Sequence, residues 1–320
     1  AVIAIDTVSG GDALENGNQS VTITITDNES APTVTLSRSA SAIDENSTST
    51  VTLTATLSVA TFQDVTVTIG ASGGTEGTDY ANISDITISA GATTGTAVVD
   101  PTDDSIYEDD ETVTVTIDGV SGGGATESGS QSVTVTITEN ESAPTVTLAR
   151  SAASIAENSG STVTLTATLS IKVDETVTVA LSTSSAATEG TDYGTISDIT
   201  ISAGSTTGTA TFDPTDDSVY EDDEAATIAI DSVSGGGASE SGSQSVTVTI
   251  TENESEPTVT LAVSATSIAE NAGSSLTLTA TLSGATDQNV TVVLGTSGTA
   301  TEGTDYTDGS GAVDDITITA

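Results

Sequence analysis

The chain has 320 residues, of which 47 are Asp or Glu and only 3 are Lys or Arg, so its formal net charge is -44. It contains neither Cys nor His, which excludes disulfide bonds, thiolate and imidazole metal ligands, and catalysis by these groups. Nucleic acid is excluded as a partner because nothing neutralises its phosphates, and an anionic membrane surface would repel the chain. The expected partners are therefore cations.

Hydrophobic residues make up 35% of the chain and recur with a regular period, which favours a folded protein over a disordered acidic one. Only 2% of the residues are aromatic, so the cores are expected to consist of Val, Ile, Leu and Ala. No apolar run reaches the roughly 18 residues of a membrane-spanning segment, so we expect no membrane insertion in this part of the protein.

The same motifs return along the chain. TEGTDY stands at 75–80, 188–193 and 301–306, so that its tyrosines are 113 residues apart. A period of this length is typical of independent domains with their own cores. We therefore expect the end of a preceding repeat, two complete repeats and the start of a following one, at 1–30, 31–143, 144–256 and 257–320.

We interpret the chain as a window from a longer array of such repeats. An alternative is a subunit whose incomplete ends complete each other in a fibre, by a strand exchange between copies. The stretch equivalent to 204–225 would then be missing from the completed domain, which argues against this alternative.

Each repeat contains segments that alternate strictly between apolar and polar residues. TVTLTATLS at 50–58, DVTVTIG at 64–70 and SVTVTIT at 132–138 are examples, and glycine-rich turns separate such segments. Alternation with β-branched residues predicts strands that are buried on one face. About seven strands in about 113 residues predict an all-β protein made of tandem seven-stranded antiparallel β-sandwiches of the immunoglobulin-like type.

Four acidic elements follow one another in each repeat, at the ends of the expected strands or in the loops beyond them. They are the ENS or ENA turn, the GTDY loop, the stretch DPTDDSIYEDDE at 100–111, where seven of twelve residues are acidic, and the TENES stretch. Without cations, adjacent carboxylates repel by about 1–4 kcal/mol per pair, and several such pairs rival the stability of a small domain. The charge pattern therefore predicts a bound divalent ion.

Calcium is the expected ion because it binds six to eight oxygens from carboxylates, carbonyl groups and water. The alternative is a solvated acidic face, as in secreted or halophilic proteins. The acids are concentrated in the turns, whereas outward strand positions carry Thr and Ser, and this favours calcium sites over a solvated face.

The ordered set ENxS, GTDY, DDxxYEDDE and TVTITENE resembles the Calx-beta domain of sodium/calcium exchangers and very large bacterial surface proteins. The resemblance covers essentially the whole chain and implies a seven-stranded sandwich that binds calcium at one end, beside the linker to the next domain. The ligands that it implies in the first complete repeat are Glu45, Asp79, Asp103, Asp104, the Ile106 carbonyl, Glu108, Glu111, Glu139 and Glu141. Those in the second are Glu157, Asp192, Asp216, Asp217, the Val219 carbonyl, Glu221, Glu224, Glu252 and Glu254.

One departure concerns the stretch after the last strand. The exchanger pattern has three consecutive Asp there, whereas this chain has Glu-Asn-Glu, or Asp-Asn-Glu at 27–29, so we expect fewer ions or weaker binding. In the last repeat, Glu270 and Asp305 are incomplete ligands, because the window lacks the central acidic stretch. Tyr107 and Tyr220 stand inside the acidic stretches, and we expect each to pack into the rim of the sandwich.

These observations predict an extracellular, bacterial, calcium-binding structural protein, in which calcium stiffens the domain junctions of a stalk, fibre or filament with an adhesin or matrix role. Its partners would be calcium ions and neighbouring repeats or copies of itself. We expect no enzyme activity, because no catalytic constellation is visible and every acid recurs in each repeat. The alternatives are a calcium-sensing regulatory module of a larger protein, or accessory repeats of a secreted enzyme.

Overall fold

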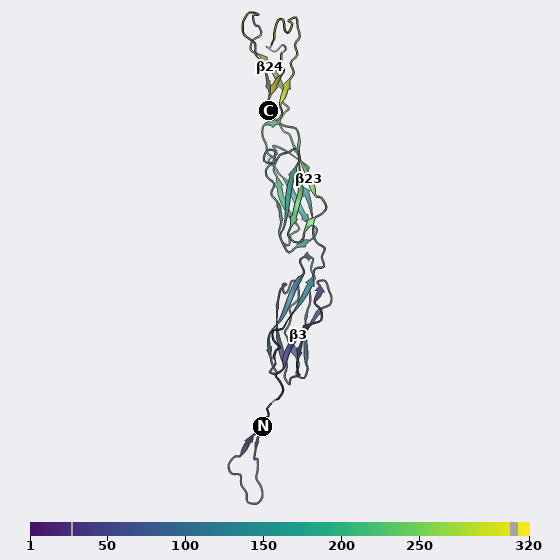
Figure 1. Cartoon of the computed structure of the whole chain (residues 1–320), viewed down its shortest axis with the longest axis vertical. Helices are drawn as coiled ribbons and strands as arrows, with labels where there is room; N and C mark the ends of the chain where they lie inside the picture. Colours follow the sequence, from purple (N-terminus) through teal and green to yellow (C-terminus); the bar gives the residue numbers. More distant parts are fainter. Residues whose placement is uncertain (27, 308–312) are drawn as a thin grey trace. The chain divides into compact units, whose positions relative to one another are not determined.

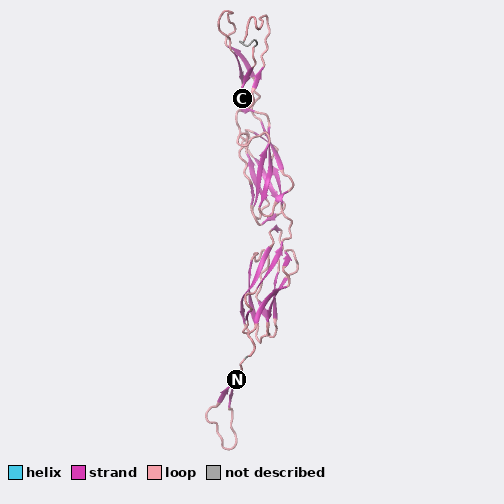
Figure 2. Ribbon diagram, in the orientation of Figure 1, coloured by secondary structure: helices cyan, strands magenta, loops and turns pink. Residues whose placement is uncertain are grey.

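The computed structural model describes residues 1–26, 28–307 and 313–320. The described residues form strands and loops without a helix, and so without a helix that could cross a membrane (Figure 2). Contacts divide the chain into two compact units, one made of residues 1–103 and 110–139, the other of residues 104–109 and 140–320. The predicted all-β fold is confirmed.

The first complete repeat is a sandwich of two sheets, and its strand β3 is marked in Figure 1. One sheet has the order β4-β12-β10-β6-β7 and the other the order β11-β3-β5-β8. The strands are β3 (Thr33–Arg38), β4 (Ala42–Asp44), β5 (Val51–Leu57), β6 (Val65–Ser72), β7 (Ile86–Ile88), β8 (Thr94–Val99), β10 (Glu111–Ser121), β11 (Thr126–Glu127) and β12 (Ser132–Thr138).

The second complete repeat has the same two sheets, with the orders β14-β23-β21-β17-β18 and β19-β15-β13-β22. Its strands are β13 (Thr145–Arg150), β14 (Ser154–Ala156), β15 (Val163–Leu169), β17 (Val177–Ser184), β18 (Ile199–Ile201), β19 (Thr207–Phe212), β21 (Glu224–Ser234), β22 (Ser239–Glu240) and β23 (Ser245–Thr251).

The seven strands that pair only antiparallel or form the centre of each sheet correspond to the expected seven, and two short strands that pair in parallel are added to them. β4 pairs parallel with β12, and β11 pairs parallel with β3. The pairings of β14 with β23 and of β22 with β13 repeat this arrangement. The short strands matter because β4 and β14 end immediately before Glu45 and Glu157, respectively.

The core lies between the two sheets of each sandwich. In β5 the side chains of Val51, Leu53, Ala55 and Leu57 are buried, and the threonines between them are half-buried. Burial of each valine or leucine side chain contributes about 1.5–3 kcal/mol relative to exposure. Aliphatic residues dominate as expected, but one aromatic pair is also buried, since Tyr193 stacks on Phe212 with ring centroids 4.7 Å apart.

The rest of the described chain forms short two-stranded pairings. The first of these, β1 with β2, lies before the first complete repeat, and two others lie after the second repeat. Their strands are β1 (Val2–Ala4), β2 (Ser20–Thr22), β24 (Val259–Val263), β25 (Leu278–Leu282), β27 (Val290–Val292) and β28 (Ile316–Ile318).

Two further pairings involve the acidic stretches. Strand β9 (Ile106–Tyr107) pairs parallel with β16 (Lys172–Val173), and β20 (Val219–Tyr220) pairs parallel with β26 (Ala285–Thr286). Tyr107 is partly buried against the core cluster of residues 146–250, which belongs to the repeat that follows it in sequence. The acidic sequence around Tyr107 does not indicate against which core it packs.

Candidate metal centre

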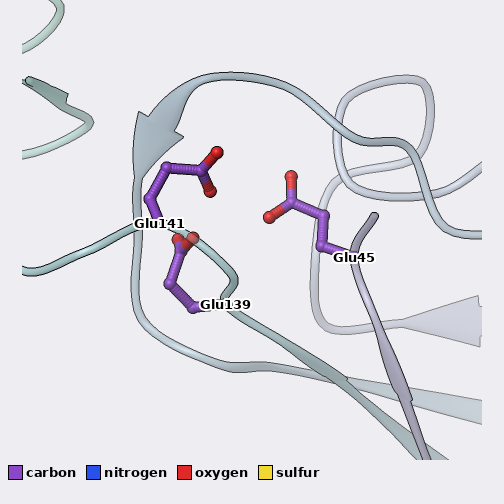
Figure 3. A group of neighbouring side chains, drawn as sticks. All are labelled: Glu45, Glu139 and Glu141. Atoms are coloured by element: carbon purple, nitrogen blue, oxygen red, sulfur yellow. The ribbon is translucent and has the colours of Figure 1, made fainter. Parts of the chain in front are cut away.

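Three glutamates converge at one end of the first repeat. Carboxylate oxygens of Glu45, Glu139 and Glu141 lie within 4.8 Å of one another, and Figure 3 shows the three side chains directed at a common space. Glu45 is placed there by the parallel pairing of β4 with β12, since its N–H donates to the carbonyl of Thr138 over 3.0 Å. Two elements far apart in sequence thereby form one cluster.

The second repeat builds the same cluster from equivalent residues. The N–H of Glu157 donates to the carbonyl of Thr251 over 3.2 Å, because β14 lies beside β23. Carboxylate oxygens of Glu157, Glu252 and Glu254 again lie within 4.8 Å of one another. Glu45 and Glu157 are both buried, which is uncommon for carboxylate side chains.

A second group of carboxylates lies in the same repeat. Oxygens of Asp192, Glu221 and Glu224 are within 4.8 Å of one another. A small surface depression joins the two groups, and seven of its ten lining residues are acidic. These seven are Glu157, Asp192, Asp217, Glu221, Asp222, Glu224 and Glu252.

Local hydrogen bonds fix the acidic loops. The carboxylate of Asp192 accepts from the N–H of Thr188, which closes the GTDY turn, and the equivalent Asp79 accepts from Thr75 in the first repeat. Asp217 accepts from the N–H of Val219 over 2.6 Å and donates its own N–H to Glu157 over 3.0 Å. The carboxylates are therefore held at fixed positions by the backbone.

Burial and like charges raise the pKa values of several of these carboxyl groups. Burial, with the nearby charge of Asp79, raises the pKa of Glu111 from 4.5 to about 7. Burial, with the contact to Asp192, raises the pKa of Glu224 from 4.5 to about 7. Burial also raises the pKa values of Glu157 and Glu221. The protein thus makes their charged forms unfavourable unless a cation is present.

Glu252 differs from its neighbours. Burial acts to raise its pKa, but N–H groups of Glu254, Glu221 and Asn253 donate to its carboxylate over 2.6 Å each, and the net pKa is lowered. Contact with this charged group raises the pKa of Glu254. One carboxylate is thus held ionised by the backbone while the acid beside it is disfavoured as an anion.

Several buried oxygens of this end of the repeat accept no hydrogen bond from the part of the chain that the structure describes. They are Oε2 of Glu224, Oε2 of Glu254 and Oδ1 of Asn253. A buried acceptor without a hydrogen-bond partner lowers the stability of the fold by roughly 1–3 kcal/mol. A ligand that binds these atoms would therefore be stabilising. All three are oxygens, the atom type that calcium and magnesium prefer.

The cluster geometry fits a calcium ion. Two oxygens that bind one calcium at about 2.4 Å can be at most about 4.8 Å apart, and the oxygens of each triad satisfy this limit. The residues present therefore fit a hard divalent cation that prefers oxygen ligands.

The structure gathers many of the predicted ligands, though not all. In the second repeat the depression is lined by six of the predicted ligands, Glu157, Asp192, Asp217, Glu221, Glu224 and Glu252. Glu254 completes a triad with two of them. Asp216 is exposed, and its charge acts on Glu157.

In the first repeat Glu111 lies near Asp79 and Glu139. Asp104 accepts from the N–H of Ile106 over 2.7 Å, and Glu108 is half-buried. Asp103, Glu270 and Asp305 are exposed.

The predicted carbonyl ligands Ile106 and Val219 lie in the short strands β9 and β20, and their role as ligands stays a prediction. Asp27 of the first TENES variant lies outside the described residues.

Some acids near the site were missed by the sequence reasoning. Asp222 lines the depression, and Asp223 accepts from the N–H of Glu252 over 2.9 Å. Asp110 does the same for Glu139 over 3.0 Å. Asp287 of the last repeat contributes to the raised pKa of Glu221. Asp110, Asp222 and Asp223 stood inside the YEDDE motifs, so their position in the motif was the available signal.

Comparison with solved structures returns low overall similarity. The crystal structure of CBD12 from CALX1.2 has a TM-score of 0.30 and 16% identity, over 68% of this chain and 99% of that chain. The crystal structure of invasin, described as a bacterial integrin-binding protein, has a TM-score of 0.34 and 19% identity, over 82% and 50%. The adhesin InvE of Yersinia pseudotuberculosis has a TM-score of 0.33 and 14% identity, over 68% and 58%. No curated protein matches. The family assignment therefore rests on sequence models.

Two family models match the chain. The Calx-beta domain model matches residues 252–314, which agrees with the resemblance seen in the motifs. The LapA domain model matches twice, at residues 30–142 and 142–254, and so covers both complete repeats and more than half of the chain. Neither model describes an enzyme domain. The chain belongs to the LapA domain family, with a Calx-beta domain match in its last repeat.

Proposed function

We propose that the chain is a segment of an extracellular, calcium-binding structural protein of a microbial surface. Its repeats, divided at about 31–143 and 144–256, bind calcium at their acidic ends, and calcium stiffens the connections between them. The whole forms a stalk, fibre or filament with an adhesin or matrix role. Membership of the LapA family, and the Calx-beta match, support a surface repeat protein of this type.

The observation that carries the proposal is the repetition of one carboxylate cluster. Glu45, Glu139 and Glu141 are equivalent to Glu157, Glu252 and Glu254, and both triads keep oxygens within 4.8 Å. An active site would need only one such cluster, whereas a stiffening ion is needed at every repeat.

Calcium would act on the path of the chain. Glu252 and Glu254 lie shortly before β24, the first strand of the next repeat. An ion that binds both of them, together with Glu157, would fix the direction in which the chain leaves the sandwich. In the absence of the ion, repulsion between the same carboxylates would loosen this exit. Millimolar extracellular calcium suffices for sites of moderate affinity.

The test is thermal unfolding of the chain of residues 1–320 in calcium, in magnesium and in chelator, followed by circular dichroism. At a calcium concentration of 100 times Kd, each site adds about 2.7 kcal/mol, which raises Tm by roughly 10 °C. Glu157→Gln with Glu254→Gln should remove the rise that the triad of Glu157, Glu252 and Glu254 contributes in the second repeat. Asp231→Asn with Glu189→Gln is the matched control, since both are exposed acids outside the triads and the charge change is equal.

Equal melting curves in calcium and chelator would mean that the acids are a solvated face, and the proposal would fail. An equal loss in the control double variant would mean that total charge, not the cluster, determines the effect. An equal rise with magnesium would contradict the preference for calcium.

A further inference from the structure

The segment within each acidic stretch that carries the tyrosine has a binding partner of its own. We define residues 104–109 and 217–222 as the tyrosine segments. Ile106 and Tyr107 pair with Lys172 and Val173, and Val219 and Tyr220 pair with Ala285 and Thr286, in both cases in parallel register. The two complete repeats thus each contribute one such segment, and in both cases it adds a strand to the repeat that follows in sequence.

The place that receives Tyr107 has a defined shape, and we call it the tyrosine seat. In the second repeat the seat consists of Lys172 and Val173 with the glycine turn at Gly236 and Gly237. A Cβ placed on Gly237 would lie 2.6 Å from Cε1 of Tyr107, so only glycine lets the ring approach so closely. Val173 is fully buried beneath it.

The first repeat contains the same seat without an occupant among the described residues. Gly123 and Gly124 have φ angles of 55° and 68°, against 53° and 59° for Gly236 and Gly237. The carbonyl of Thr61 accepts from Gly91 over 2.8 Å, as that of Val173 accepts from Gly204 over 2.7 Å. A Cβ on Gly124 would meet nothing within 4 Å, in contrast to Gly237.

Exposed apolar residues flank this open seat. Phe62 is fully exposed and Val59 is 43% exposed, although both are large hydrophobic side chains next to the buried Thr61. The residues Ala60 and Thr61 are also the same pair as Ala285 and Thr286, which receive the segment of Tyr220 in the last repeat. An identical dipeptide in an equivalent place therefore already binds a Val-Tyr strand.

We infer that Ala60–Thr61 and the glycine turn at Gly123–Gly124 form a docking seat for the tyrosine segment of a further repeat of the same kind. The occupant is an Ile-Tyr or Val-Tyr strand flanked by acids. The parallel pairing supplies backbone hydrogen bonds, and the ring fills the space over Gly124. Both tyrosine segments of this chain already pair with a strand of the repeat that follows them, so the occupant comes from another repeat. The inference does not depend on cation binding.

The test uses the full chain with one substitution, Phe62→Trp, which gives a single fluorescent reporter because the chain has no Trp. The probes are peptides of residues 102–111 and 215–224, and the same peptides with alanine in place of tyrosine. We expect a saturable fluorescence change with the tyrosine peptides, in calcium and in chelator, at a salt concentration that screens the acids. The alanine peptides should bind at least tenfold more weakly.

A matched pair of variants locates the binding. Gly124→Ala adds a methyl group where the ring would lie, and should weaken binding at least tenfold. Gly129→Ala is the control, since Gly129 has a similar φ of 69° and open space around it but lies outside the seat. A Leu14→Trp chain is the control reporter, because Leu14 is exposed and far from the seat in sequence.

Three outcomes would overturn the inference. One is the absence of a saturable change up to millimolar peptide, and another is equal binding of the tyrosine and alanine peptides. The third is a fluorescence change on raising the concentration of the chain alone that Gly124→Ala abolishes but that Tyr107→Ala with Tyr220→Ala leaves unchanged, which would assign the seat to another surface of a second copy.

Discussion

The two complete repeats share one fold and one charge pattern, but their tyrosine seats differ in occupancy. In the second repeat Val173 pairs with Tyr107, whereas the equivalent Thr61 has no strand partner among the described residues. The glycine turn nevertheless keeps almost the same φ angles in both repeats. The seat is therefore formed by the sandwich itself, before any strand is added, and the occupant need not induce it.

The largest expected effect on stability comes from truncating one buried leucine in the core of each repeat. Leu53 and Leu165 are equivalent and fully buried, so Leu53→Ala and Leu165→Ala should each destabilise their own repeat by about 2–5 kcal/mol. Only Leu165→Ala should also expose residues 106–107 to faster hydrogen exchange, because these amides pair with the second unit. Hydrogen exchange read by mass spectrometry separates the two variants. Equal protection of 106–107 in both would contradict the difference between the repeats.

An intermediate effect is expected from pH, and it should be the same in both repeats. The folded-state pKa values of Glu111 and Glu224 are raised from 4.5 to about 7, so between these values the folded state binds more protons than the unfolded state. In chelator, stability should therefore be highest near pH 4.5 and fall as pH rises through 7, by on the order of 5 °C in Tm.

Two variants make this prediction specific. Glu111→Gln should reduce the decrease in Tm with rising pH for the first repeat, and Glu224→Gln should do so for the second. Thermal unfolding between pH 4.5 and 8 measures this. Calcium should oppose the fall, because the ion competes with the proton for the same oxygens. Stability that rises with pH in chelator would show that the raised pKa values do not control the folded state.

The smallest expected effect distinguishes the two seats directly. Gly124→Ala and Gly237→Ala place an L-residue at similar positive φ angles, which costs about 1–2 kcal/mol at each site. Gly237→Ala should lower the free energy of unfolding by about 1 kcal/mol more than Gly124→Ala does, because the added carbon meets the Tyr107 ring. This difference in the free energy of unfolding between the two glycine variants should vanish when each is made in a Tyr107→Ala chain and measured by urea unfolding. An excess that persists without the ring would mean that the glycine turn, not the tyrosine, determines the cost.

The main strands of each sandwich were predictable, because they are long enough to show the alternation of apolar and polar residues. The segment expected at 50–58 is β5, Val51–Leu57, with the predicted faces. The two-residue strands β9 and β16 carry no such period. Their pairing depends on which segments meet in three dimensions, and the sequence could not show this for Tyr107.

The candidate site was predictable in kind and less so in arrangement. Motif order indicated Glu45 and Glu139, but only the parallel pairing of β4 with β12 places them together. The difference between Glu252, whose pKa is lowered, and Glu254, whose pKa is raised, depends on three backbone N–H groups that no motif reveals. Asp223, whose carboxylate accepts from the N–H of Glu252, was missed although it stands inside the YEDDE motif.

The tyrosine segments and their seats have a consequence for how such a gene can change length. Tyr107 and Tyr220 are 113 residues apart, and so are the receiving positions Lys172 and Ala285. Unequal recombination between repeats adds or removes multiples of this period, wherever the crossover falls. Each interior repeat then still has a tyrosine strand before it and a seat to receive that strand, so copy number can vary without new compensating substitutions.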